Sequence, residues 1–110
     1  MTDKKIVLTT AGSEVEARKI AQSLVEQRLA ACVNIVPQIE SVYRWQGKVE
    51  SAQEWLLLIK TSAERFSSVC EAIRQLHSYE LPECISINVE DGSAAYLEWL
   101  ADSIGGTITL

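Results

Sequence analysis

Residues 30–61, AACVNIVPQIESVYRWQGKVESAQEWLLLIKT, decide the fold of this chain. Two runs rich in apolar and β-branched residues, 31–45 and 48–60, flank the dipeptide Gln46-Gly47. Such runs are typical of β-strands, and glycine supplies the positive φ that a tight hairpin turn needs. Pro37 interrupts the first run, and because proline lacks the N–H of the strand ladder, it predicts a bulge there. The stretch therefore predicts one long β-hairpin.

This hairpin is long for the chain that carries it. Each arm has about 15 residues and could reach roughly 50 Å at ~3.4 Å per residue. A compact domain of this length has a radius of gyration of about 13 Å and is therefore about 35 Å across. An exposed apolar ribbon aggregates unless another surface covers it. We expect the tip to lie against a second copy of the chain, with interface packing by Val42, Tyr43, Trp45, Val49 and Trp55.

The elements on either side of the hairpin follow helix and strand patterns. Ser13 and Glu16 form a capping box, and Thr61 and Glu64 form a second one; each box predicts the start of a helix. Apolar residues at helical or alternating spacing mark the remaining elements. The predicted strands are 3–10, 83–89 and a short tail strand 107–110, and the predicted helices are 14–29, 62–76 and 94–104.

The order strand–helix–strand–strand–helix–strand predicts the fold class. With right-handed crossovers it gives an antiparallel sheet with two helices on one face, the ferredoxin-like arrangement. We expect one α+β domain over residues 1–110: a ferredoxin-like β-α-β-β-α-β sandwich with a long central hairpin and an extra C-terminal helix. The second sheet face is left uncovered, which again favours oligomerisation.

Charge and apolar content exclude several classes of protein. Ten Lys and Arg residues against fifteen Asp and Glu residues give a net charge of −5, and the basic residues are scattered. This balance argues against a nucleic-acid or anionic-membrane partner. The longest apolar runs, such as 55–59, are far too short for a membrane span. With no targeting segment in view, we expect a cytoplasmic protein.

The cysteines give no metal or redox motif. Cys32, Cys70 and Cys84 are odd in number and widely spaced, and no C-x-x-C pair occurs. We expect reduced thiols that pack as small apolar groups.

Few residues offer catalytic chemistry. His77 is the only histidine, and it stands where the second helix is predicted to end. It is either a metal ligand or a helix cap. At the C-terminal end of a helix, the helix dipole favours a cation. No cysteine stands at ligand or nucleophile spacing from it, and the sequence has no G-x-S-x-G, Walker or G-x-G-x-x-G motif. We expect no enzyme activity.

Glu50 and Glu54 lie at an even spacing on one predicted strand, and hence on one face of it. Lys60 shares this parity. Together with Tyr79 and Glu80, these residues could line a small polar cleft, although a solvated sheet edge explains the same pattern.

Five segments, collinear and spread over nearly the whole chain, resemble the CutA divalent-cation tolerance proteins: Arg28–Asn34, Tyr43–Lys48, Glu54 with Lys60-Thr61, His77–Glu83 and Tyr96–Trp99. The resemblance implies a cytosolic homotrimer of ferredoxin-like subunits that exchange their hairpins. It also implies a role in tolerance of copper and other divalent metals without established catalysis. Because the trimer is similar to that of PII signalling proteins, the alternative is a sensor or scaffold that binds a protein partner or a small anionic ligand, with Lys60 as its anchor.

The resemblance also implies where ligands would bind. Copper-binding members are associated with a cysteine at the end of the first strand and two adjacent histidines after the second helix; Thr9, Leu76 and His77 occupy these positions here. Since threonine and leucine supply no thiolate or imidazole donor, we expect only weak binding of Cu²⁺ or another divalent ion, at His77. An intersubunit ligand cleft is expected at Trp45, Glu54, Lys60, Tyr79 and Glu80.

Overall fold

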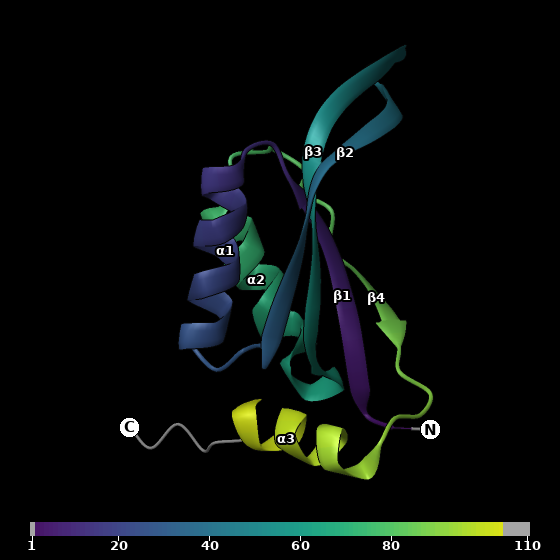
Figure 1. The fold of residues 1–110 in the computed structure, drawn as a ribbon. Helices are drawn as coiled ribbons and strands as arrows, with labels where there is room; N and C mark the ends of the chain where they lie inside the picture. The colour runs from purple at the N-terminus through teal and green to yellow at the C-terminus, as the bar shows by residue number, and fades with distance from the viewer. Residues whose placement is uncertain (1, 105–110) are drawn as a thin grey trace.

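Strands and helices follow one another along the chain in the predicted order (Figure 1). The structure, a computed structural model, describes residues 2–104, so the predicted tail strand at 107–110 lies outside the described residues. The elements are β1 Lys4–Ala11, α1 Glu14–Glu26, β2 Cys32–Trp45, β3 Lys48–Ser62, the 3-10 turn η1 Ala63–Arg65, α2 Phe66–Leu76, β4 Ile85–Asn88 and α3 Ala94–Ile104.

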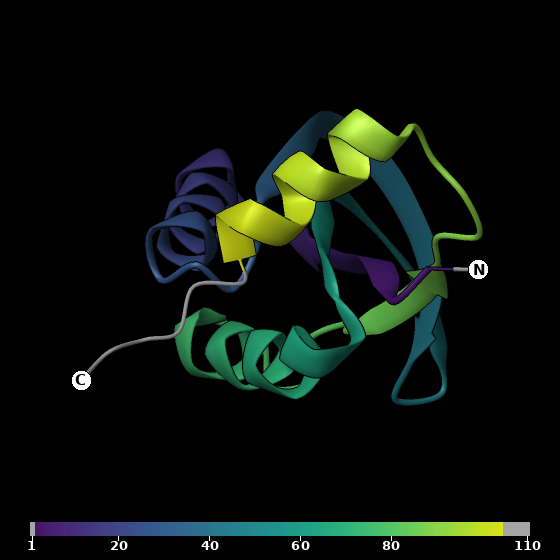
Figure 2. The same cartoon turned by 90° about the horizontal axis from the view of Figure 1, so that it is seen from below.

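The four strands form one sheet in the order β2-β3-β1-β4, and every neighbouring pair is antiparallel. Helices α1 and α2 lie on the same face of this sheet, and α3 crosses the end at which β1 begins (Figures 1 and 2). This confirms the predicted ferredoxin-like fold, long hairpin and extra helix.

The core lies between the sheet and α1 and α2. Alternate residues of the central strands, such as Val7 on β1 and Ile59 on β3, are fully buried against Ile20, Leu24 and Ile73 of the helices. Burying each such side chain stabilises the fold by about 1.5–3 kcal/mol. A smaller cluster joins α3 to the sheet end through Ala31, Leu100 and Ile104.

The opposite sheet face is also apolar, but α1 and α2 do not cover it. Ile6 and Leu8 of β1 pair with Ile87 and Ile85 of β4, whose side chains are about half exposed. The residues on this face are partners in register, so their side chains lie on one surface. As expected from the sequence, α1 and α2 leave one sheet face uncovered.

The hairpin has the turn and the bulge that its sequence predicts. Gln46 and Gly47 have φ values of 50° and 82°, as in the turns that connect tightly paired strands. The β2–β3 register shifts between Val36 and Ile39, next to Gln38 at φ 55°. The ribbon projects beyond the other elements of the chain (Figure 1). The longest dimension of the structure, hairpin included, is 44 Å.

We call residues 41–52 the distal hairpin. Its apolar side chains are exposed in the single chain: Val42 to 68% and Val49 to 66%, with Tyr43 and Trp45 about half exposed. Trp55 does not belong to this group, because it pairs with Ala11 of β1 and packs against the core. Trp55 is therefore partly buried within its own chain, and its packing at an interface stays a prediction.

The two capping boxes have different outcomes. Ser13 Oγ accepts the Glu16 N–H at 3.2 Å, which confirms the cap of α1. The second box was wrong: the buried Thr61 hydroxyl donates to the Leu29 carbonyl at 2.6 Å, which joins β3 to the end of α1. Helix α2 instead begins at Phe66 after the turn η1, without a side-chain cap.

Two elements are shorter than predicted. α1 ends at Glu26, because Arg28 takes the left-handed φ of 59° and the N–H groups of Arg28 and Leu29 bond back to Val25 and Leu24. This is a Schellman motif, and it stops the helix three residues early. β4 begins only at Ile85, because the preceding residue is bonded to α2, as described below.

Candidate functional site

The segment from residue 77 to residue 84 connects α2 to β4 and crosses the end of the sheet where β1 finishes (Figure 1). We call it the crossing loop. Its first residue, His77, is the C-cap of α2, and the His77 N–H donates to the Ile73 carbonyl at 2.9 Å. The helix-cap interpretation of His77 is therefore confirmed.

Both ring nitrogens of His77 are engaged. Nε2 lies 2.5 Å from the Thr10 carbonyl oxygen, and Nδ1 lies 3.0 Å from the Tyr79 backbone nitrogen. A carbonyl only accepts and an N–H only donates, so Nε2 carries the hydrogen and Nδ1 provides the lone pair. The side chain has no exposed surface. These bonds leave no free lone pair on the ring for a metal ion.

Glu16 fastens the crossing loop to α1. Its two carboxylate oxygens accept hydrogen bonds from the N–H and the hydroxyl of Ser78, at 2.5 and 2.9 Å. One of these oxygens lies 3.5 Å from His77 Nδ1. The sequence interpretation, in which Glu16 reaches back to its own helix start, missed this tertiary role.

Tyr79 reaches from the crossing loop to the hairpin. Its hydroxyl donates to Glu54 Oε2 at 2.7 Å, and its ring lies against His77 with centroids 4.6 Å apart. Gly12 permits this approach, because a Cβ at that position would lie 2.8 Å from the Tyr79 hydroxyl oxygen. Burial raises the pKa of Tyr79, and the Glu54 carboxylate raises it further. Tyr79 is therefore held as a neutral hydrogen-bond donor.

A cavity of about 600 Å³ lies between the distal hairpin and the crossing loop. We call it the hairpin pocket. Its walls include three aromatic rings and three carboxyl groups, those of Tyr43, Trp45, Tyr79, Glu54, Glu80 and Glu83. Burial raises the pKa of Glu83, and the charge of Glu54 acts in the same direction. The volume is that of a small-molecule site.

Four of the five residues expected in a ligand cleft line this pocket: Trp45, Glu54, Tyr79 and Glu80. Lys60 does not. It lies on the same face of β3 as Glu54, as its parity predicts, but six positions away, about 20 Å at ~3.4 Å per residue. Its ammonium group donates to the Tyr96 hydroxyl of α3 at 3.3 Å.

The sequence interpretation missed six residues that line the pocket: Thr10, Ser41, Val42, Tyr43, Leu81 and Glu83. Tyr43 could have been found, because it alternates with Trp45 and so lies on the same face of β2. Its register partner is Glu50 of β3, which completes the polar strand face predicted from spacing. Glu83 carried no such signal, because it lies outside the sheet ladder, in the crossing loop.

The residues at the family's copper positions do not form an assembled metal site here. The Thr9 hydroxyl is buried and has no hydrogen-bond partner among the described residues, and Leu76 packs against the core. Within residues 2–104, no group of three His, Cys, Asp or Glu side chains is placed to hold a metal ion. A hydroxyl and a fully hydrogen-bonded imidazole are a poor donor set for copper.

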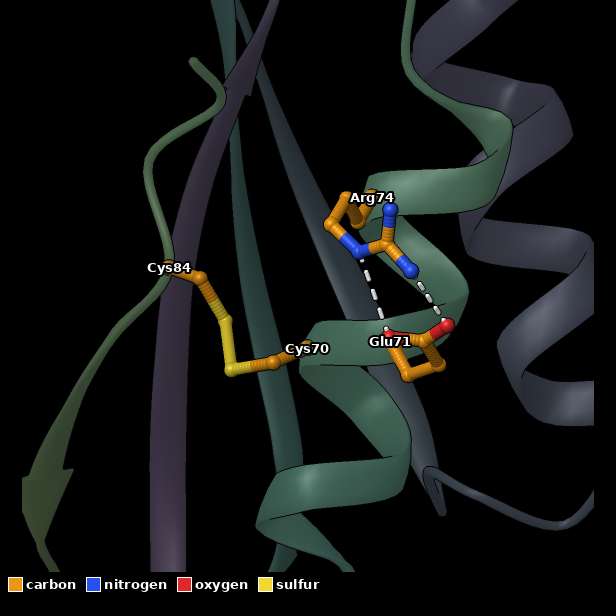
Figure 3. Close-up of a disulfide and its surroundings, with 4 residues drawn as sticks. All are labelled: Cys70, Glu71, Arg74 and Cys84. Carbon is orange, nitrogen blue, oxygen red and sulfur yellow. Dashed lines mark hydrogen bonds and ion pairs between the residues drawn. A yellow bond between two sulfur atoms is a disulfide. The ribbon is translucent and has the colours of Figure 1, made fainter.

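A disulfide joins Cys70 of α2 to Cys84 at the end of the crossing loop (Figure 3). The expectation of reduced thiols was therefore wrong for these two residues; Cys32 is free. Sequence spacing alone could not reveal the pair, because the loop must turn back along α2 to bring the sulfurs together. The neighbouring Glu71–Arg74 ion pair is exposed and lies within α2 (Figure 3).

No helix among the described residues is both long and apolar enough to cross a membrane.

A ferredoxin-like sheet, an overlong hairpin and a pocket between that hairpin and the crossing loop define a small α+β protein. The chain belongs to the CutA1 divalent ion tolerance protein family, whose sequence model matches residues 5–103.

Relatives from distant organisms support this assignment. The chain is 48% identical to the divalent-cation tolerance protein CutA of Thermus thermophilus over 93% of this chain and 99% of that protein. It is 41% identical to human protein CutA over 92% of this chain, but it spans only 58% of the human protein.

Solved structures of relatives have the same fold. The Thermus thermophilus protein gives a TM-score of 0.91 at 48% identity, covering 93% of this chain and 99% of that one. A structure described as the periplasmic divalent cation tolerance protein CutA of Archaeoglobus fulgidus gives 0.89 at 39% identity, covering 92% and 98%.

Proposed function

We propose that this protein acts in the tolerance of divalent metal ions, copper among them, as a homotrimer without catalytic activity. The observation that carries the proposal is the family match over residues 5–103, since the relatives are named for divalent-cation tolerance. The direct test is growth of a deletion strain in graded copper. Rescue by the wild-type gene supports the role, and unchanged copper sensitivity on deletion contradicts it.

Two uncovered apolar surfaces support the oligomer. One is the distal hairpin, and the other is the sheet face that carries Ile85 and Ile87. Exposed apolar side chains that gather on one surface are typical of a protein–protein contact. A threefold assembly of copies would cover both without a second kind of protein.

Metal binding, if the protein acts on the ion directly, is proposed to be weak and to use His77. A metal at Nδ1 must displace the Tyr79 N–H, and a metal at Nε2 must displace the Thr10 carbonyl. Equilibrium dialysis with Cu²⁺ tests this by comparing wild type with His77→Ala. Cys32→Ser is the control, because the free Cys32 thiol is a competing soft ligand. Equal uptake by wild type and His77→Ala removes His77 from the account.

The second candidate function is that of a sensor or scaffold which binds a ligand in the hairpin pocket. The specific observation in its favour is the pocket itself, with its aromatic walls and the partly buried Glu54–Tyr79 hydrogen bond. Thermal-shift screening of small metabolites tests it, with Trp45→Ala as the pocket variant. Stabilisation of wild type but not of the variant identifies a ligand of this site.

The cytoplasm is the proposed compartment. The reducing conditions there would open the Cys70–Cys84 disulfide that the structure contains, whereas a periplasmic location would keep it formed. Alkylation of thiols in intact cells, followed by mass analysis, distinguishes the two locations. Alkylated Cys70 and Cys84 support the cytoplasm, and an intact disulfide contradicts it.

A further inference from the structure

We propose that the hairpin pocket binds an organic cation, an ammonium or guanidinium group carried on a small apolar body. This inference rests on the proposed ligand-binding function of the pocket and reverses the charge of the ligand expected from the sequence. That expectation depended on Lys60 as an anchor, and Lys60 lies at the α3 end of the sheet.

The charge of the pocket walls favours a cation. Carboxyl groups of Glu54, Glu80 and Glu83 line it, and none of the described residues that line it is Lys, Arg or His. An anion would meet three acidic groups and no compensating cation, whereas a cation would meet only opposite charge.

Glu54 is the central element of this site. It is 6% exposed, and the only side-chain hydrogen bond that it makes among the described residues runs from the Tyr79 hydroxyl to Oε2. No Lys, Arg or His of residues 2–104 forms an ion pair with it. Buried carboxylates are normally paired with a cation, because desolvation of the charge is costly. A cationic ligand at Oε1 would supply the missing partner.

The aromatic walls suit the same ligand. Tyr43 and Trp45 stand on one face of β2, and Tyr79 faces them from the crossing loop. The faces of such rings attract cations, and tryptophan does so most strongly. The cavity, at about 600 Å³, is far larger than a bare metal ion needs. Aromatic rings beside carboxyl groups in one cavity therefore favour an organic cation.

Glu83 adds an independent consequence. Burial and the charge of Glu54 raise the pKa of Glu83, so part of the wall is protonated at mildly acid pH. A bound cation would favour the ionised carboxylate and lower that pKa. Binding should therefore strengthen as the pH rises from about 4.5, the ordinary value for glutamate.

The cation could come from two sources. One is a free organic amine, and the other is a basic side chain on a second copy of this chain, since the distal hairpin carries Arg44 and Lys48. The chemistry recognised by the pocket is the same in both cases.

The test uses three probes of matched size and different charge: phenethylammonium, 2-phenylethanol and phenylacetate. Titration calorimetry is run on wild type, on Glu54→Gln and on the control Glu98→Gln, which removes an equal charge on exposed α3. The cation should bind at least about tenfold more tightly than the anion, and Glu54→Gln should remove that preference. Glu98→Gln should keep it. Circular dichroism checks that each variant is folded.

Two further variants distinguish a free amine from a basic side chain of a second copy. They also keep the proposal testable if Glu54→Gln does not fold. If a second copy fills the pocket, the cation binds only to the double variant Arg44→Ala, Lys48→Ala, and this outcome also supports the proposal. Glu83→Gln should reduce the rise of affinity with pH without removing Glu54. Preference for phenylacetate overturns the cation proposal but keeps a ligand site. Absence of binding by all three probes to wild type and to the double variant overturns both.

Discussion

The two halves of the β2–β3 hairpin are both paired strands, but their surroundings differ. In the proximal half, Cys32–Val36 paired with Leu56–Lys60, alternate side chains such as Leu57 and Ile59 are fully buried. In the distal half, Val42 and Val49 are mostly exposed. β-propensity specifies a strand in both halves, but only the surrounding elements decide whether its side chains are buried. The distal half is thus a strand pair whose apolar side chains stay exposed in the single chain.

The largest expected difference between the halves is in core packing. Leu57→Ala should lower the free energy of unfolding by about 2–5 kcal/mol, because it removes a fully buried side chain and leaves a cavity. Val49→Ala should change it by no more than about 0.5 kcal/mol in a chain kept monomeric. Urea denaturation of both variants in the background of Tyr43→Asp with Trp45→Asp measures this. Equal losses would mean that the distal half is already packed within one chain.

The second largest effect on the free energy of unfolding should come from the disulfide. Loss of Cys70–Cys84, which are 14 residues apart, should cost roughly 3 kcal/mol in the loop-entropy account of cross-links. The variant Cys70→Ser with Cys84→Ser is compared with wild type under oxidising and reducing conditions. Cys32→Ser is the matched control, since Cys32 is unpaired. A wild type that is equally stable with and without reductant would contradict a structural role for the bond.

A smaller effect is expected where the crossing loop meets β1. Gly12→Ala should destabilise the fold by about 1 kcal/mol, because the new Cβ would lie 2.8 Å from the Tyr79 hydroxyl oxygen. Tyr79→Phe removes that oxygen, so the double variant should lose less than the sum of the two single losses. A double-mutant cycle on urea midpoints gives the coupling. Strict additivity would show that the contact has no energetic weight.

The smallest effect is the pH dependence contributed by Glu83. Its pKa is raised in the folded chain, so the folded state binds more protons than the unfolded state at pH values between the unfolded and the folded pKa. Stability from this group is therefore complete below about pH 4.5 and is lost as the pH rises through the folded pKa. Thermal unfolding of wild type and Glu83→Gln between pH 4 and 8 tests the sign. The difference between the two should change along this range; a constant offset contradicts it.

Local patterns were enough to predict most of the fold. Alternation and a turn glycine gave the hairpin, Pro37 gave its bulge, and Ser13 gave the start of α1. The errors fall where a tertiary contact overrides a local pattern. Thr61 bonds to the end of α1 instead of capping α2, and Cys84 is held by Cys70 outside the β4 ladder.

The site was harder to predict than the fold. The even spacing of Glu54 and Lys60 correctly predicted that both lie on one face of β3. The spacing does not say whether two residues on one face are close enough to share a site. The closeness of Tyr79 to Glu54 depends on a loop that no periodicity describes. The pocket is acidic because Lys60 lies at the other end of the sheet, which its spacing in the sequence does not reveal.

Sedimentation velocity of the wild-type chain in dilute solution tests the central claim most directly, namely that the distal hairpin finishes its packing on other copies. The account predicts a single species with three times the mass of the 12.2 kDa chain. Tyr43→Asp combined with Trp45→Asp should shift that species to monomer or aggregate. A stable wild-type species at 12.2 kDa would contradict the account.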